Sequence, residues 1–159
     1  LLGCGSILGH VRTAAQILAS DYGVGSDVFS VTSFNELARD GQDADRWNML
    51  HPTAEARVPY IAQVLGSEAT IAATDYMKSF ADQVRAFVPT ENYRVLGTDG
   101  YGRSDSRANL RRHFEVNEFY VVVAALTELA KRGEVDKQVV AEAIAKYGID
   151  ADKVNPLYA

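Results

Sequence analysis

The sequence predicts an α/β fold, a three-layer α/β/α sandwich around a mostly parallel sheet. Short segments rich in apolar or small residues read as strands, and they alternate along the chain with segments that have helical periodicity. Connections of helical length are typical of parallel strands, because antiparallel neighbours need only a short turn. The predicted strands are residues 1–4, 27–32, 70–74 and 93–98.

The first predicted helix follows the first strand directly. Ser6 is its predicted N-cap, and Gly23 ends it. The apolar residues of this segment fall on one helical face: Ile7, Val11, Ala14, Leu18 and Tyr22.

Three helices are predicted between the second and third strands, and the third of them begins with a proline. Ser33 and Glu36 have capping-box spacing and begin a helix, which we expect the Asp40-Gly41 pair to interrupt. A second short helix then begins at Asp43 and ends before Pro52. Pro59 suits the first turn of a further helix that runs to Leu65.

The remaining helices are predicted from apolar periodicity and capping residues. One follows the third strand and stops before Pro89, and a short one covers residues 108–114. Asn117 caps a strongly apolar helix over 118–132, and Asp136 caps the last helix, which runs to Tyr147. The tail, residues 149–159, carries few signals for structure of its own.

Composition indicates one ordinary globular domain, residues 1–159. The formal net charge of −5 argues against a nucleic-acid partner. The single cysteine excludes an internal disulfide and fits a reducing, cytoplasmic location. No apolar run approaches the roughly 18 residues of a membrane span, and no signal peptide is visible, so no membrane partner is expected.

The glycine-rich loop from Gly97 to Arg107 is the first candidate site. Its glycines, serines and arginines suggest an anion cradle, because backbone N–H groups can approach a phosphate closely at glycine. The alternative is a tight turn in which Gly100 or Gly102 has positive φ and the polar side chains cap backbone groups. The candidate anion or interface contacts are Arg103, Ser104, Ser106 and Arg107.

Other candidate sites have weaker signals. The segment Gly3–Leu8 approaches a dinucleotide-binding pattern, but Leu8 replaces its third glycine and Thr32 stands where a ribose-binding acid is expected. Cys4 has the position of a nucleophile at a strand end, although a small buried thiol is the simpler interpretation. The histidines, His10, His51 and His113, lack the spacing of metal ligands, so no metal site is assigned.

Several long strings carry a resemblance to a known family. They are SVTSFNELARDGQDADRWNMLHP (30–52), ATDYMKSFADQVRAFVP (73–89), LGTDGYGRSDSRANLRRHFEV (96–116), YVVVAALTELAKRGEVD (120–136) and AIAKYGIDADKVNP (143–156). Together they resemble the C-terminal region of the homodimeric bacterial pyruvate dehydrogenase E1 component. The chain also opens without methionine, inside an apolar run, and is expected to be the last domain of a longer polypeptide.

The resemblance implies a fold and a role. The fold is that of a transketolase C-terminal domain, with a mixed five-stranded sheet in which one strand is antiparallel. The full chain would use thiamine diphosphate and Mg²⁺ to decarboxylate pyruvate and acetylate the lipoyl arm of the dihydrolipoyl acetyltransferase (E2) core. In that family the preceding domains hold the cofactors, so this segment is predicted to carry no catalytic, cofactor-binding or metal-binding residue and to support the homodimer.

Two rival hypotheses stay open at this point. In the first, the Gly97–Arg107 loop binds a regulatory anion or nucleotide, which predicts an anion held by its backbone N–H groups. In the second, the chain is a stand-alone enzyme that uses Cys4 or a histidine, which predicts turnover by this segment alone.

Overall fold

A computed structural model describes residues 1–159 and contains one sheet of four parallel strands. The strands are β1 (Leu2–Gly3), β2 (Phe29–Ser30), β3 (Thr70–Ala73) and β4 (Tyr93–Leu96), and their order in the sheet is β2-β1-β3-β4. The chain therefore starts in the middle of the sheet, builds outward to β2, and then crosses over β1 to build outward on the other side.

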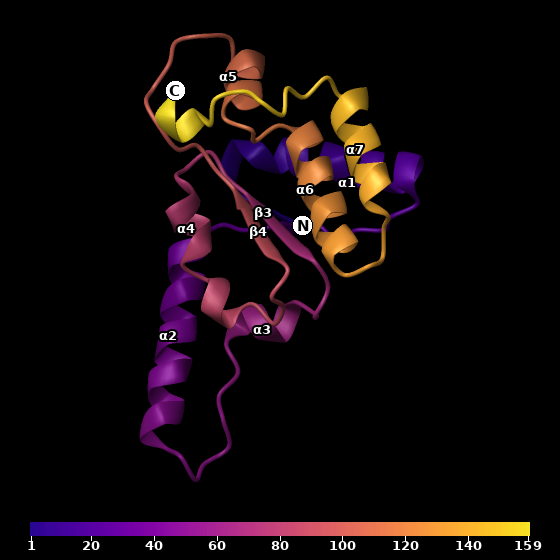
Figure 1. The fold of residues 1–159 in the computed structure, drawn as a ribbon. Helices are drawn as coiled ribbons and strands as arrows, with labels where there is room; N and C mark the ends of the chain where they lie inside the picture. The colour runs from indigo at the N-terminus through magenta and orange to yellow at the C-terminus, as the bar shows by residue number, and fades with distance from the viewer.

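Seven α-helices and three short 3₁₀ segments connect and cover the strands (Figure 1). The α-helices are α1 (Leu8–Tyr22), α2 (Phe34–Leu50), α3 (Tyr60–Val64), α4 (Lys78–Asp82), α5 (Arg107–His113), α6 (Glu118–Lys131) and α7 (Lys137–Lys146). The 3₁₀ segments are η1 (Gly5–Ile7), η2 (Arg85–Phe87) and η3 (Pro156–Tyr158). No helix is both long enough and apolar enough to cross a membrane.

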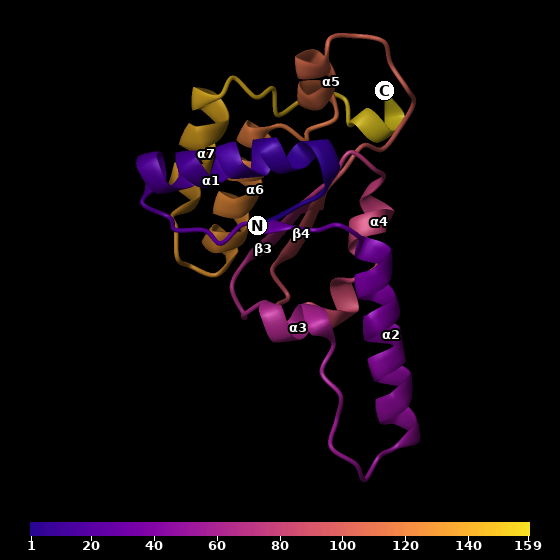
Figure 2. The same ribbon diagram turned by 180° about the vertical axis from the view of Figure 1, so that it is seen from behind.

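The helices form two layers, one on each face of the sheet, as the predicted α/β sandwich requires (Figures 1 and 2). Alternation along β3 sends Ile71 and Ala73 into one apolar cluster and Ala72 into the other. The first cluster includes Val11 and Leu18 of α1 and residues of α6 and α7. The second includes Phe34 of α2 and residues of α3 and α4. The core thus consists of two apolar layers that share the sheet.

The capping predictions are confirmed for three helices, but the one for the first helix is wrong, because Ser6 lies within η1 and α1 begins after Ile7 without a side-chain cap. The side chains of Ser33, Asn117 and Asp136 each accept a hydrogen bond from a backbone N–H in the first turn of α2, α6 and α7. Gly23 ends α1 with the expected left-handed backbone, φ 65°. These elements form where they were expected because their boundaries depend on residues within one helical turn.

The interruption predicted at Asp40-Gly41 is wrong, because α2 runs unbroken from Phe34 to Leu50. Gly41 is buried in the middle of this helix, and a Cβ placed on it would lie only 2.3 Å from the ring of Phe87. The glycine is thus explained by a close approach to a distant aromatic ring, which a local pattern does not reveal.

The sheet also differs from the expected mixed one. Its four strands are all parallel, and no fifth antiparallel strand occurs among residues 1–159. The long segments outside the helices, such as 51–59, form turns or extended stretches that are not hydrogen-bonded to the sheet. In addition, the single helix expected before Pro89 is divided into α4 and η2.

Candidate functional site at the carboxyl edge of the sheet

The carboxyl ends of the parallel strands meet at one edge of the sheet. The chain passes from β2 back across β1 to β3, so β1 and β3 are neighbours and the loops that follow them lie side by side. Open α/β sheets commonly bind ligands at such a reversal of the strand order. A hollow of about 470 Å³ lies there. Its polar lining consists of Ser6, Asp75, Thr98, Asp105, Arg107 and Arg111.

Side chains that bond to one another occupy this edge. Ser6, after β1, donates its hydroxyl to the carboxylate of Asp75, after β3. Arg111 of α5 donates to Ser6 Oγ at 2.9 Å and to His10 Nε2 at 2.8 Å. The guanidinium can only donate, so Nε2 of His10 accepts and Nδ1 carries the hydrogen that faces Glu118.

This network links α1, α5 and α6 to the ends of β1 and β3. Ser6, His10, Asp75, Arg111 and Glu118 each have a partner within this network, whereas Arg107, which also lines the hollow, forms no side-chain hydrogen bond or ion pair. A polar network whose members are bonded to one another is typical of a structural role, which here is to hold α1, α5 and α6 against the sheet. From the sequence, Ser6 and His10 were considered separately, in the Gly3–Leu8 segment and among the histidines, and neither was connected with Asp75 or Glu118. The available signal was that Ser6 and Asp75 each lie within three residues of the carboxyl end of a strand.

The glycine-rich loop has the backbone geometry that the turn hypothesis requires. Gly100 has a φ of 102°, which confirms the prediction of positive φ in at least one of its two glycines. Asp99 accepts from the backbone N–H of Lys78 at 3.1 Å and so caps α4. Asp105 accepts from Ser106 N at 2.6 Å, and Ser106 accepts from Asn109 N at 3.3 Å.

The four predicted contact residues of this loop behave differently from one another. Ser106 is the N-cap of α5, as expected of a helix-start residue. Ser104 makes no side-chain hydrogen bond, so the cap expected of it is wrong. Arg107 lines the hollow, and both it and Arg103 are exposed. The Asn109 side chain and the Ser106 N–H hold the pKa of Asp105 below its ordinary value, so this carboxylate stays charged beside the hollow.

Cys4 and the histidines do not assemble into a catalytic group. Cys4 is half-buried beside the α2-side apolar cluster, and no histidine is bonded to it. His51 stacks on Trp47, and its Nδ1 bonds to the Trp47 carbonyl at 2.8 Å. Burial lowers the pKa of His113, and the charges of Arg103 and Lys153 lower it further. No group of three or more histidine, cysteine, aspartate or glutamate side chains converges in the chain.

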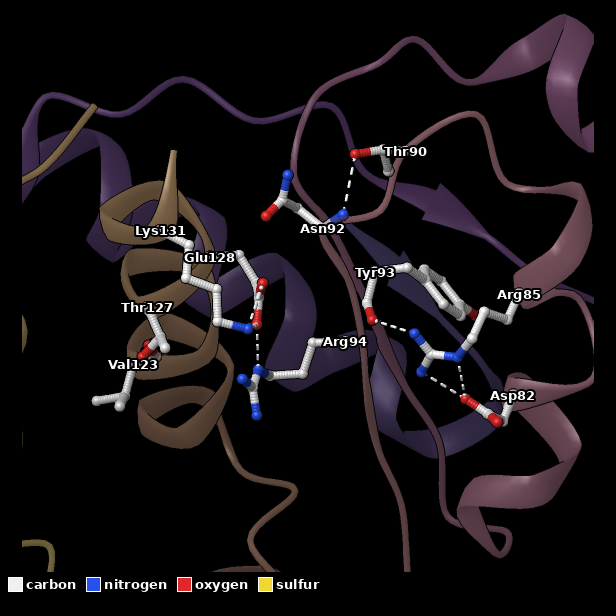
Figure 3. A network of polar contacts seen from close by, with 10 residues as sticks. All are labelled: Asp82, Arg85, Thr90, Asn92, Tyr93, Arg94, Val123, Thr127, Glu128 and Lys131. Atoms are coloured by element: carbon white, nitrogen blue, oxygen red, sulfur yellow. Dashed lines mark hydrogen bonds and ion pairs between the residues drawn. The ribbon is translucent and has the colours of Figure 1, made fainter. Parts of the chain in front are cut away.

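A second polar cluster crosses the open edge of β4 (Figure 3). Glu128 of α6, almost completely buried, accepts from Arg94 Nε at 2.6 Å and from Lys131 Nζ at 3.0 Å. On the other side of the strand, Arg85 donates to the Tyr93 carbonyl at 2.8 Å while pairing with Asp82. These contacts fasten helices to the edge strand and occupy one of its outward carbonyl groups.

Comparison with known proteins identifies the family. Residues 1–117 match the family model described as the transketolase-like TK C-terminal domain. The chain belongs to that family. Over its whole length it is 74% identical to the pyruvate dehydrogenase E1 component of Escherichia coli (strain K12), 69% to that of Haemophilus influenzae and 56%, over 99% of the chain, to that of Pseudomonas aeruginosa. In each case it spans 18% of the relative's length.

The family match supports the fold derived from the strands and helices. It covers all four strands and the helices through α5, whereas α6 and α7 lie beyond the matched residues. The resemblance stated from the sequence strings is confirmed, because the E1 relatives align with the whole chain at high identity.

Proposed function

We propose that this chain is the C-terminal structural domain of a pyruvate dehydrogenase E1 polypeptide, and that it completes the homodimer and supports the preceding domains. The high identity to E1 components over the whole chain supports this assignment. The chain spans 18% of those relatives' length, which leaves ample polypeptide for the catalytic domains.

The observation that carries the structural role is a projecting arm, residues 45–59. It consists of the distal half of α2 and the segment that returns from it, and it extends away from the sheet in both views (Figures 1 and 2). Met49 on this arm is 71% exposed, and Leu50 and Val58 are exposed as well. Large apolar side chains on a projecting element are typical of surfaces that another domain or subunit covers.

The arm is held in shape by its own contacts. The Trp47 ring stacks on His51 at 4.3 Å and lies 4.4 Å from the guanidinium of Arg57. The Asn48 side chain bonds to both the N–H and the carbonyl of Arg57, at 2.7 and 2.9 Å. A surface that is ordered before binding loses less conformational entropy when a partner covers it.

The proposed reaction belongs to the full-length cytoplasmic chain. Thiamine diphosphate would act as the electron sink for decarboxylation of pyruvate, and the acetyl group would pass to the lipoyl group of the dihydrolipoyl acetyltransferase core. We infer that the carboxylates of this segment do not form the Mg²⁺ site of the full-length chain. Mg²⁺ requires several converging oxygen ligands, whereas Asp75 and Asp105 at the crevice are each bonded to other side chains.

Removing residues 1–159 from the full-length enzyme tests the structural role. We expect a weaker dimer in sedimentation velocity and lower turnover, because the arm contacts are lost while every cofactor-binding group remains. A truncated enzyme with an unchanged dimer and full turnover would contradict the proposal. As a complementary test, calorimetric titration of the isolated segment with thiamine diphosphate and Mg²⁺ is expected to show no saturable binding in the micromolar range.

A further inference from the structure

The C-terminal tail, residues 149–159, forms a strap along one side of the domain. After α7 it passes alongside α5 and returns to the loop that follows β4 (Figures 1 and 2). Just before the strap begins, the Gly148 carbonyl accepts from Arg112 of α5 at 2.5 Å. Near its far end, the strap lies so close to Gly100 that a Cβ there would sit 2.1 Å from the Pro156 carbonyl oxygen. Both ends of the strap are therefore fixed on neighbouring elements.

Lys153 holds the middle of the strap against the end of α5. Its Nζ donates to the His113 carbonyl at 2.8 Å and pairs with the Glu115 carboxylate at 3.1 Å. The same ammonium lies 5.7 Å from the centre of the Tyr120 ring, which is within the range of a cation–π contact. Lys153 thus makes the side-chain contacts that join the middle of the strap to the domain.

The His113 side chain, next to this contact, carries an unsatisfied nitrogen. Its ring packs edge-on against Phe114, with the ring centres 4.8 Å apart. Nε2 is buried and has no hydrogen-bond partner, the one such side-chain atom in the chain. A neutral imidazole can occupy this position at little cost, because Nδ1 carries the single hydrogen and Nε2 stays bare. A protonated imidazole cannot, because its N–H at Nε2 would be buried without an acceptor.

The charges near His113 also oppose its protonation. Burial lowers the pKa of His113, and the positive charges of Arg103 and Lys153 lower it further. The Glu115 carboxylate acts in the opposite direction, but it is already paired with Lys153. Arg103 belongs to the loop after β4, whereas Lys153 belongs to the strap. Detachment of the strap therefore removes one of the two positive charges that face the ring.

We propose that the strap is a pH-sensitive latch, which is closed on α5 while His113 is neutral and is released when Nε2 takes up a proton. Protonation creates a buried N–H without an acceptor and adds a third positive charge beside Arg103 and Lys153. Release moves Lys153 away and lets the imidazolium turn toward water.

The direction of the pH effect follows from proton linkage. A histidine whose pKa is lowered in the closed state binds more protons in the released state, so a falling pH favours release. The closed state keeps its full stability well above pH 6.5, the ordinary pKa of histidine, and loses stability as the pH falls below that value.

Hydrogen–deuterium exchange of the full-length enzyme tests the latch. Mass spectrometry of the C-terminal peptide gives protection factors, corrected for the intrinsic pH dependence of exchange, at pH 7.5 and 5.5. The hydrogen-bonded amides of Leu157 and Tyr158 report closure. We expect protection of the strap to fall about threefold or more at pH 5.5, while peptides of α1 keep theirs. Equal protection of the strap at the two pH values would overturn the proposal.

His113→Phe separates the latch from a general effect of acid. It removes the titrating group and keeps a ring of similar size against Phe114, and the unpaired Nε2 has no hydrogen bond to lose. The strap of this variant should be as protected as the unmodified strap at pH 7.5 and should stay protected at pH 5.5. Release at pH 5.5 in His113→Phe would assign the effect to another group and overturn the proposal. The matched control, His51→Phe, changes a ring that stacks on Trp47 in the arm and should leave acid release unchanged.

Lys153→Met tests the other side of the contact. It removes the charge and the bonds to the His113 carbonyl and Glu115 but keeps a long aliphatic side chain. We expect lower protection of the strap already at pH 7.5 and a smaller further loss at pH 5.5, because release no longer moves a positive charge away from the ring. A variant with unmodified protection at pH 7.5 and an unmodified pH response would contradict the coupling between Lys153 and His113.

Discussion

Arg94 and Glu128 join the edge strand β4 to helix α6 through a hydrogen-bonded ion pair of 2.6 Å between Nε and Oε1. The Glu128 side chain is only 3% exposed, whereas its partners Arg94 and Lys131 reach solvent. A carboxylate taken out of water depends on such partners, because its lost hydration must be replaced by protein donors (Figure 3).

Replacing Glu128 by glutamine should destabilise the chain by about 2 kcal/mol, because Arg94 and Lys131 lose the carboxylate charge and one of its two acceptor oxygens while the shape is kept. Urea unfolding followed by circular dichroism measures the difference in free energy. The control is Glu134→Gln, which breaks the exposed pair with Arg132 and should cost less than about 0.5 kcal/mol. Equal losses of unfolding free energy for the two substitutions would show that the burial of Glu128 does not strengthen its ion pairs.

The same carboxylate predicts a pH dependence. Burial raises the pKa of Glu128, but the bonds from Lys131 and Arg94 outweigh it and lower the pKa below the ordinary value of 4.5. A group with a lowered folded-state pKa contributes stability above its unfolded pKa and loses it as the pH falls through the folded pKa. The difference in unfolding free energy between the unmodified chain and Glu128→Gln should therefore be constant from about pH 8 to 6 and shrink below about pH 5. A difference that grows on acidification would contradict this assignment.

Much of the fold was predictable because its signals are local. The caps Ser33, Asn117 and Asp136 lie within one turn of the N–H groups that they accept from, so a short sequence window contains both partners. Gly41 is the opposite case. Its close neighbour is Phe87, in a different element, and a window around Asp40-Gly41 shows only a helix breaker.

The network at the carboxyl edge escaped prediction for the same reason. Ser6 is 69 positions from Asp75 and 105 from Arg111, and His10 is 108 from Glu118. The order of the strands in the sheet, β2-β1-β3-β4, brings these residues together. That order cannot be predicted from the spacing of residues along the chain. The glycine loop was predictable in its backbone geometry, but its contact with the tail at Pro156 was not.

The two glycines of that loop should respond differently to a methyl group. Gly100→Ala is expected to release the C-terminal tail and cost about 1–3 kcal/mol, because its φ is positive and the new Cβ would meet the Pro156 carbonyl. A Cβ on Gly102 would have no other atom within 4 Å, so Gly102→Ala should change the free energy of unfolding by less than about 0.5 kcal/mol. Hydrogen exchange of the Tyr158 amide, bonded to Asn155 at 2.8 Å, reports tail release. Slow exchange of that amide in Gly100→Ala would show that the tail does not depend on the close approach.

The loop itself is expected not to bind a phosphate. An anion site there needs several free backbone N–H groups that converge. Within the loop, Thr98 N already donates to the Tyr76 carbonyl and Ser106 N to Asp105. Asp99 and Asp105 also repel an anion, and Asp105 stays charged because its pKa is lowered. Titration of the chain with inorganic phosphate and with ADP, followed by amide chemical shifts of residues 97–107, should show only weak, non-saturating changes up to about 10 mM. Arg107→Ala serves as the control, since loss of a diffuse surface charge should reduce such changes slightly and uniformly. Saturable shifts at submillimolar concentration that are confined to the loop and abolished by Arg107→Ala would instead establish the regulatory anion site.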